Sequence, residues 1–387
     1  MLKRLFALSL AVSLIFVFTA TLSASPQDPA SDTHLSPSDL SAESAILAAV
    51  DQDGDLIEIF GRSERKRMGM ASTTKIMTAL TALSLADQNT KIAVSPLAVG
   101  IEGSSVYLVA GETLSLRELI YALLLSSAND AAVAIAIGIC GSVEEFVREM
   151  NELALRIGAK DTNFKNPHGL YDEAHYTTAY DLALITSHAL ENELILEAVS
   201  TQKTTIPHPE LEYGRLLVNH NKMLKLYESA IGVKTGFTKK TGRCLVSAAE
   251  RDGLRLIAVT LNASDDWNDH TKLLDYGFNT YEMTTLYGAG ELTLPFSVVG
   301  GTSDEVILTN SSAIRLVLPK DTDKKNIKMT VLSTQRFLFA PVESSESVAE
   351  VTFEYEGRRV SSELVTTLSV SRKQTKRKGF FDLFFKD

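Results

Sequence analysis

The stretch 70-MASTTKIMTAL-80 places a serine three positions before a lysine, in a segment that otherwise has the apolar spacing of a buried helix. Residues three apart lie on one face of a helix, so Ser72 and Lys75 are expected side by side near its first turn. The pair alone has two interpretations: an N-cap serine followed by a solvated lysine, or a nucleophile beside its base. The rest of the chain has to decide between them.

Length and composition limit the possible classes of protein. The 387 residues are enough for two domains, and 45% hydrophobic with 22% charged residues is ordinary for a globular chain. A formal charge of -10 argues against a nucleic-acid partner. The seven histidines and two cysteines have no metal-ligand spacing, so we do not expect a structural or catalytic metal. Cys140 and Cys244 either form a disulfide or are buried and free.

The first 24 residues have the pattern of a secretory signal peptide. Lys3 and Arg4 precede an apolar run over residues 5–20, and small residues follow. Residues 25–40 are poor in apolar residues and rich in Pro, Ser and Asp, which predicts a flexible leader. We therefore expect the mature protein outside the cytoplasm.

The order of predicted elements indicates an α/β (α+β) domain over residues 41–286. Strands are expected at 45–50, 56–60, 244–250 and 254–262, and helices at 116–125, from about 130 to 139, and from near 265. A sheet built from both ends of this segment would hold the helices between its early and late strands. Residues 287–371 then alternate apolar and polar positions, which predicts a small all-β domain.

The final segment, residues 372–387, joins five cations between Arg372 and Lys378 to a cluster of aromatic residues. As a helix its last dozen residues would span only ~18 Å, too short for a hydrocarbon core of ~30 Å. A basic segment joined to exposed aromatics is typical of a lipid interface, so we predict membrane contact there. The alternatives are a frayed tail or a strand that completes the all-β domain.

Two further short motifs bear on the Ser72–Lys75 pair. Ser127-Ala128-Asn129 follows a predicted helix, and Lys234-Thr235-Gly236 is expected at the front of a strand. Each alone is compatible with a cap or a turn. Chance rarely produces all three motifs in this order, with gaps of 55 and 107 residues between their first members, at element boundaries. Together they favour the nucleophile interpretation.

These motifs make the chain resemble the D-alanyl-D-alanine carboxypeptidases, the low-molecular-mass penicillin-binding proteins with a serine transpeptidase/β-lactamase-like domain. The similarity extends to four catalytic-domain blocks and one block of the C-terminal β-domain. The blocks read ASTTKIMTA, SSANDAA, NPHGLYDEAHYTTAYDLA, VKTGFTKKTGRCLVSAA and FAPVESSESVAEV. The resemblance implies removal of the terminal D-alanine from peptidoglycan stem peptides, covalent inhibition by β-lactams, and no cofactor.

The resemblance also implies a nucleophile and its proton carriers. Ser72 is the nucleophile and Lys75 its base, which requires Lys75 to be neutral. Burial and the charge of Lys234 would lower the pKa of Lys75. Ser127 would bridge the two lysines and return the proton to the leaving amine, and Asn129 would hold the substrate amide or orient Lys75.

The remaining implied roles are in substrate binding. Lys234 and Thr235 would bind the terminal carboxylate, and Gly236 would let the substrate backbone lie against the strand edge. The backbone N–H groups of Ser72 and Phe237 would form the oxyanion hole. The chain departs from the usual family pattern at four positions: Gly69, Ala128, His220 and Thr241.

Three alternatives share parts of this pattern. A D,D-endopeptidase would use the same groups. A β-lactamase needs a glutamate that activates water, but 191-ENELI-195 lies 64 residues after Ser127, 43 before Lys234, and ends in Ile195 where an asparagine is required. A non-catalytic peptidoglycan-binding scaffold is disfavoured because the catalytic set is intact. We also expect His168 to be a structural imidazole.

Overall fold

The computed structural model describes residues 35–374. The predicted signal peptide, most of the predicted leader and residues 375–387 of the predicted tail lie outside the described residues. No helix between residues 35 and 374 combines the length and apolar character needed to span a membrane.

The first domain is built on a five-stranded antiparallel sheet with the order β2-β1-β9-β8-β7. These strands are β1 (Ser44–Val50), β2 (Leu56–Arg62), β7 (Ala230–Thr238), β8 (Gly242–Arg251) and β9 (Leu254–Ala263). The two ends of the segment therefore meet in one sheet, as predicted. Strand β7 forms one edge, so its outer backbone groups have no strand partner within this sheet.

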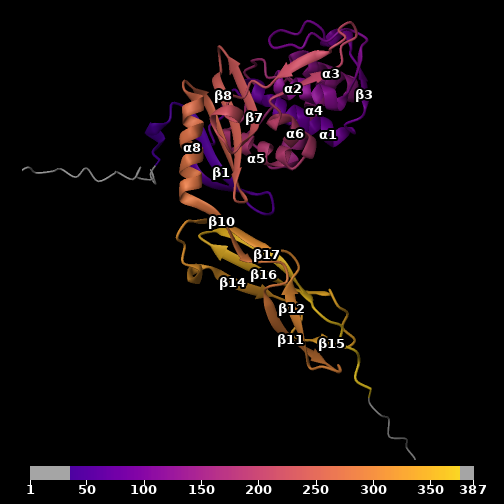
Figure 1. Ribbon diagram of the computed structural model, residues 1–387, viewed down its shortest axis with the longest axis vertical. Helices are drawn as coiled ribbons and strands as arrows, with labels where there is room; N and C mark the ends of the chain where they lie inside the picture. The colour runs from indigo at the N-terminus through magenta and orange to yellow at the C-terminus, as the bar shows by residue number, and fades with distance from the viewer. Residues whose placement is uncertain (1–34, 375–387) are drawn as a thin grey trace, which may run out of the picture. The chain divides into compact units, whose positions relative to one another are not determined.

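Helices cover both faces of the sheet, as Figure 1 shows. Helix α8 (Asp266–Thr280) packs on one face through Leu273, Leu274 and Phe278. On the other face, α5 (Ala179–Leu190) and α6 (Glu193–Ser200) contact the strands. The same core continues into α1 (Lys75–Leu85), α2 (Leu116–Leu125), α3 (Asn129–Cys140) and α4 (Val143–Arg156). Smaller elements are β3 (Lys91–Ala93), β4 (Thr113–Ser115), β5 (Lys203–Ile206), β6 (Arg215–Val218) and α7 (Met223–Leu226).

Local signals explain where the central helices begin and end. Ser115 and Glu118 form a capping box at the start of α2, which begins and ends at the residues predicted from the sequence. Helix α3 ends at Gly141, whose positive φ of 79° suits a glycine C-cap. The junction between these two helices is short, and it places Ser127 in the same cleft as Ser72, next to Asn129 at the start of α3.

The second domain is all-β, as predicted, with strand β10 (Tyr281–Tyr287) pairing with β13 (Ile314–Pro319). A six-stranded sheet has the order β14-β16-β17-β12-β11-β15. Its strands are β11 (Thr293–Val299), β12 (Glu305–Asn310), β14 (Lys328–Leu332), β15 (Leu338–Phe339), β16 (Ser347–Tyr355) and β17 (Arg358–Thr366). The strands of this domain begin at residue 281 rather than 287, because β10 follows α8 without a linker that the sequence could reveal.

Two segment boundaries differ from the sequence expectations. The end of the predicted leader is ordered: residues 37–39 form a 3-10 helix, and Leu40 is buried. Arg62 holds this segment by donating to the carbonyls of Pro37 and Leu40, at 2.8 and 2.6 Å. At the other end, Arg372 forms a bridge with Gly301, so the first residues of the predicted tail belong to the all-β domain. Cys140 and Cys244 are both free.

Candidate active site

Ser72 and Lys75 lie side by side, as their spacing predicts. Ser72 is in a short 3-10 helix, Ala71–Thr74, that runs directly into α1, and Lys75 is the first residue of α1. Lys75 Nζ is 3.0 Å from Ser72 Oγ. Lys75 is fully buried. The solvated-lysine interpretation of this pair is therefore wrong.

Two other oxygen atoms fix the direction of the Lys75 amine. Nζ donates to Asn129 Oδ1 at 2.7 Å and to the His168 carbonyl at 2.6 Å. Both atoms only accept hydrogen bonds, so in a neutral amine they take both N–H groups. The lone pair of Nζ then faces Ser72 Oγ, which is the arrangement that a general base needs. Of the two roles considered for Asn129, the geometry favours orienting Lys75.

Burial makes the neutral form of this lysine accessible. Complete burial, followed by the charge of Lys234, lowers the pKa of Lys75 well below its ordinary value of 10.5. The carboxylate of Asp130 acts in the opposite direction. Burial also lowers the pKa of Lys234, to about 7. The site thus holds two lysines that both favour loss of a proton more than a solvated lysine does.

Lys234, Thr235 and Gly236 lie in the middle of edge strand β7, not at its front. Gly236 lies close to the nucleophile segment: a β-carbon there would be 3.0 Å from the Ser72 backbone nitrogen, a tight contact. The glycine therefore lets β7 lie against the segment that carries the nucleophile. Lys234 Nζ donates to the carbonyl of Thr235 at 3.0 Å.

Ser127 lies in the cleft but does not bridge the lysines. Its φ is 58°, a left-handed conformation that costs a non-glycine residue on the order of 1–3 kcal/mol and is common at active sites. The side chain is 5% exposed. Among the hydrogen bonds of the described residues, none joins Ser127 Oγ to Lys75 or Lys234. The predicted bridge is therefore absent from this state of the site.

The cleft has a volume of 320 Å³, and its wall includes a cation that the sequence analysis missed. Arg243, on β8, donates from Nε and Nη2 to Asp266 Oδ1 at 3.0 and 2.6 Å. Its guanidinium carbon lies 5.7 Å from the centre of the Trp267 ring. The lining residues are Ser72, Ser104, Ser127, His220, Thr235, Gly236, Phe237, Arg243, Asp266 and Trp267. Arg243 pairs with Phe237 across strands β7 and β8. Its position directly after the turn that follows the Lys234–Gly236 motif was the sequence signal that could have identified it.

The segment around His168 packs against the backbone that precedes Ser72. The half-buried His168 ring accepts a hydrogen bond at Nδ1 from Leu170 N, 3.2 Å away, a local contact that favours the structural role. Burial lowers the pKa of His168 to about 3, so the ring is neutral. Gly169, with φ of 90°, passes so close that a β-carbon would be 2.0 Å from the Ala71 carbonyl oxygen. The chain needs glycine at this position, which the sequence analysis did not identify.

One pair of departures from the family pattern is physically linked. A β-carbon at Gly69 would lie 2.5 Å from Thr241 Cγ2. The threonine methyl group therefore occupies space that a larger residue at position 69 would need. The third departure, His220, lines the cleft, where partial burial and then the charge of Lys234 lower its pKa.

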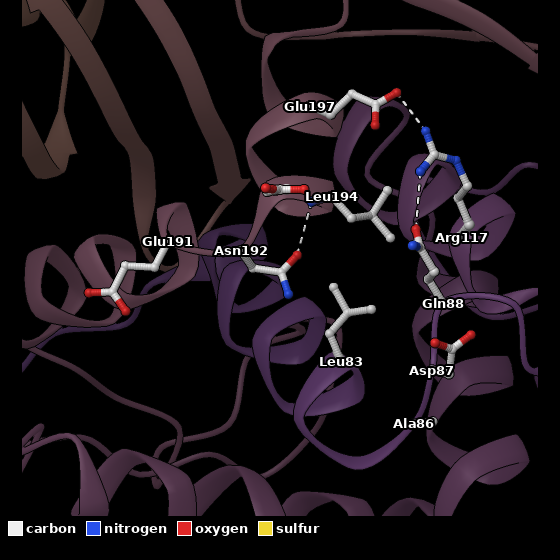
Figure 2. A pocket seen from close by; sticks show the side chains of 10 residues that line it. Leu83, Ala86, Asp87, Gln88, Arg117, Glu191, Asn192, Leu194 and Glu197 are labelled. Carbon is white, nitrogen blue, oxygen red and sulfur yellow. Dashed lines mark hydrogen bonds and ion pairs between the residues drawn. The ribbon is translucent and has the colours of Figure 1, made fainter.

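The glutamate of 191-ENELI-195 is not part of this cleft. Glu191 caps the end of α5 and lines a separate hollow of 400 Å³ (Figure 2). There Asn192 caps α6, and Glu197 pairs with Arg117. Among residues 35–374, no three His, Cys, Asp or Glu side chains gather closely enough to hold a metal ion.

Comparisons with known proteins identify the family of both domains. A family model described as D-alanyl-D-alanine carboxypeptidase matches residues 31–265. A second, described as the C-terminal domain of penicillin-binding protein 5, matches residues 281–372. Both domains of the chain are thus matched, in the order found here.

Individual proteins show the same similarity. D-alanyl-D-alanine carboxypeptidase DacF from Bacillus subtilis is 31% identical over 353 residues, which is 89% of this chain and 88% of the relative. DacC from Escherichia coli is 30% identical over 76% of both chains. The structure of penicillin-binding protein 5 from Haemophilus influenzae has a TM-score of 0.70 and 25% identity, covering 88% of this chain and 100% of the other.

Proposed function

Because the chain belongs to the D-alanyl-D-alanine carboxypeptidase family of serine hydrolases, we propose that Ser72 attacks the amide between the last two D-alanines of a peptidoglycan stem peptide. The observation that carries this proposal is the 3.0 Å contact between Lys75 Nζ and Ser72 Oγ. The other two contacts of Nζ leave its lone pair facing this hydroxyl. β-Lactams acylate the same serine because their strained amide resembles the dipeptide.

We assign each bond change to a group of the site, and the transfer through Ser127 requires its hydroxyl to move within hydrogen-bonding distance of Lys75. Ser72 Oγ bonds to the carbonyl carbon while its proton passes to Lys75, and the N–H groups of Ser72 and Phe237 stabilise the oxyanion. The proton then passes through Ser127 to the leaving nitrogen, and D-alanine departs. Water hydrolyses the ester, which releases the shortened peptide and restores Ser72. Substrate adds along the free edge of β7, where Lys234 and Thr235 bind its carboxylate.

Two assays with the mature protein test this function. D-alanine release from a soluble pentapeptide is expected, together with a long-lived adduct of one benzylpenicillin in intact-mass spectra. An adduct that clears within seconds would favour a β-lactamase. Cleavage of cross-linked dimers without D-alanine release would favour an endopeptidase, and no adduct would favour a non-catalytic scaffold. The place of Glu191 outside the cleft supports the peptidase over the β-lactamase.

We assign Arg243 to the terminal carboxylate as well. Its side chain is 42% exposed and its charge is permanent, whereas the pKa of Lys234 lies near 7. We expect Arg243→Gln to lower kcat/KM for a D-Ala-D-Ala peptide about 10- to 100-fold, the value of one charge-assisted hydrogen bond. For the same peptide with a C-terminal amide, the decrease in kcat/KM should be much smaller. Steady-state D-alanine or D-alaninamide release measures both.

A control separates substrate binding from loss of the ion pair. Arg243→Gln leaves the buried Asp266 carboxylate without its partner, so the double variant Arg243→Gln/Asp266→Asn is measured beside it. If acid and amide substrates lose activity equally in both variants, Arg243 does not bind the carboxylate.

We further propose that residues 1–24 direct secretion and that the tail holds the protein at the outer face of the cytoplasmic membrane. Because Arg372 and Lys373 bond to the all-β domain, the chain should be shortened after Gln374. We expect the full chain, and not the shortened one, to sediment with vesicles of phosphatidylglycerol and phosphatidylcholine. Pentapeptide hydrolysis in solution should be equal for the two. Equal sedimentation would contradict the anchor.

A further inference from the structure

A strained loop beside the cleft presents an exposed tyrosine. Tyr107 has φ of 55°, in the left-handed region, and its side chain is 82% exposed. A strained conformation that leaves an aromatic ring in water gains nothing from core packing. Three residues earlier, Ser104 lines the cleft that contains Ser72. The loop therefore joins the candidate active site to an aromatic group outside it.

A buried ion pair holds this loop against the β5–β6 hairpin. Arg215 and Glu112 form two hydrogen bonds, of 2.9 and 2.6 Å, with both side chains 6% exposed. Arg215 also donates to the carbonyl of Tyr107 at 3.2 Å and to that of Pro207 at 2.7 Å. One side chain thus fixes the backbone of the loop and of the hairpin turn, which carries Tyr213, 86% exposed.

Residues at the start of α3 hold the rest of the loop. The buried Asp130 carboxylate accepts from Ser105 Oγ at 2.6 Å and from the backbone of Val106 and Leu108. Asn129, which orients Lys75, also donates to the carbonyl of Glu102. The position of Tyr107 is therefore fixed by the same short helix start that builds the catalytic site, as a binding surface requires.

We propose that Tyr107 and Tyr213 form a platform for the glycan strand that carries the stem peptide, an inference that rests on the proposed function. The 320 Å³ cleft is at the small end of the range for ligand sites, ~300–1,000 Å³, so a polymeric substrate must extend past it. The loop reaches the cleft through Ser104, and Arg215 holds the hairpin turn that carries Tyr213 against this loop.

The chemistry of the two segments favours a neutral sugar over other occupants. A tyrosine ring offers a rigid flat face with few rotamers to lose, and its electron-rich surface suits the C–H groups of a pyranose ring. The exposed Glu102, Glu210 and Glu212 lie on the same two segments and disfavour an anionic lipid surface. N-acetylated hexosamines carry no charge and avoid that repulsion.

The test compares two substrates that differ only in the sugar. D-alanine release is measured from a pentapeptide and from the same pentapeptide linked to its N-acetylated disaccharide. We expect the full-length protein to prefer the second, and Tyr107→Ser and Tyr213→Ser each to lower that preference about 3- to 10-fold. Tyr107→Phe should retain it, because the ring face remains. Leu332→Ser, an exposed apolar position on β14 of the second domain, is the matched control.

Acylation by benzylpenicillin reports whether each variant keeps an intact site. If a variant loses activity equally on both substrates, the tyrosines contact the peptide and the proposal is overturned. The proposal also fails if the variants keep the wild-type preference for the disaccharide-linked substrate, or if the wild type shows no such preference. Tyr213→Ser repeats the test on a separate turn, so a folding defect at position 107 does not decide it. If no D-alanine is released from either substrate, the proposed function fails, while sedimentation with insoluble peptidoglycan still reports whether the tyrosines bind the glycan.

Discussion

Replacing Ser72 with alanine is expected to abolish both D-alanine release and covalent labelling by benzylpenicillin. The variant keeps the buried Lys75 and its bonds to Asn129 and His168, but no oxygen remains to form the acyl bond. Loss of a serine nucleophile reduces turnover by ~10⁶-fold in a well-studied hydrolase, so activity should fall below detection. Intact-mass spectrometry with benzylpenicillin, sampled over time, measures the labelling directly.

Ser84→Ala is the matched control for this experiment. Ser84 lies on the same helix α1 but is exposed, and its Oγ donates only to the carbonyl of Thr81. This control should form the adduct at the wild-type rate. An adduct that survives in Ser72→Ala would move the nucleophile to another hydroxyl of the cleft, with Ser127 the first to examine by peptide mapping.

The parts of the site that depend on local geometry were predictable from the sequence. Ser72 and Lys75 are three positions apart on a continuous helical segment, so helix periodicity alone brings them together. The capping box of α2 likewise fixes a boundary through residues that are neighbours in sequence. In both cases the deciding contacts span only a few residues.

The parts that depend on distant backbone were not predictable. The His168 carbonyl orients Lys75 from 93 residues away, and a carbonyl has no side-chain identity for a sequence to show. The Lys234–Gly236 motif lies inside β7, where Gly236 approaches the Ser72 backbone closely. From the sequence alone, a glycine after Lys-Thr indicates a turn before a strand as readily as a close approach within one. Arg243 and Asp266 pair across 23 residues with no motif around them.

The second large effect is expected when Lys75 is replaced by a residue that stays charged. Lys75→Arg keeps a cation in the site but has no accessible lone pair, because a guanidinium does not deprotonate in proteins. A general base contributes about 10²- to 10⁴-fold, so the rate of acylation by benzylpenicillin should fall by that factor at every pH. Stopped-flow or quenched acylation with the wild type as reference gives this ratio. Lys91→Met, an exposed lysine on β3, should acylate normally.

The pH dependence of the wild type gives an independent test of the same assignment. As pH rises through the lowered pKa of Lys75, its neutral fraction grows and kcat/KM for the D-Ala-D-Ala peptide should increase. Above about 7, Lys234 loses the charge that attracts the terminal carboxylate, so kcat/KM should fall again. The two apparent pKa values belong to the coupled pair of lysines.

Lys234→Arg, which stays charged, should move only the falling limb to higher pH. If the rising limb is missing in the wild type, the rate does not follow the neutral fraction of Lys75, and Lys75 is not the base.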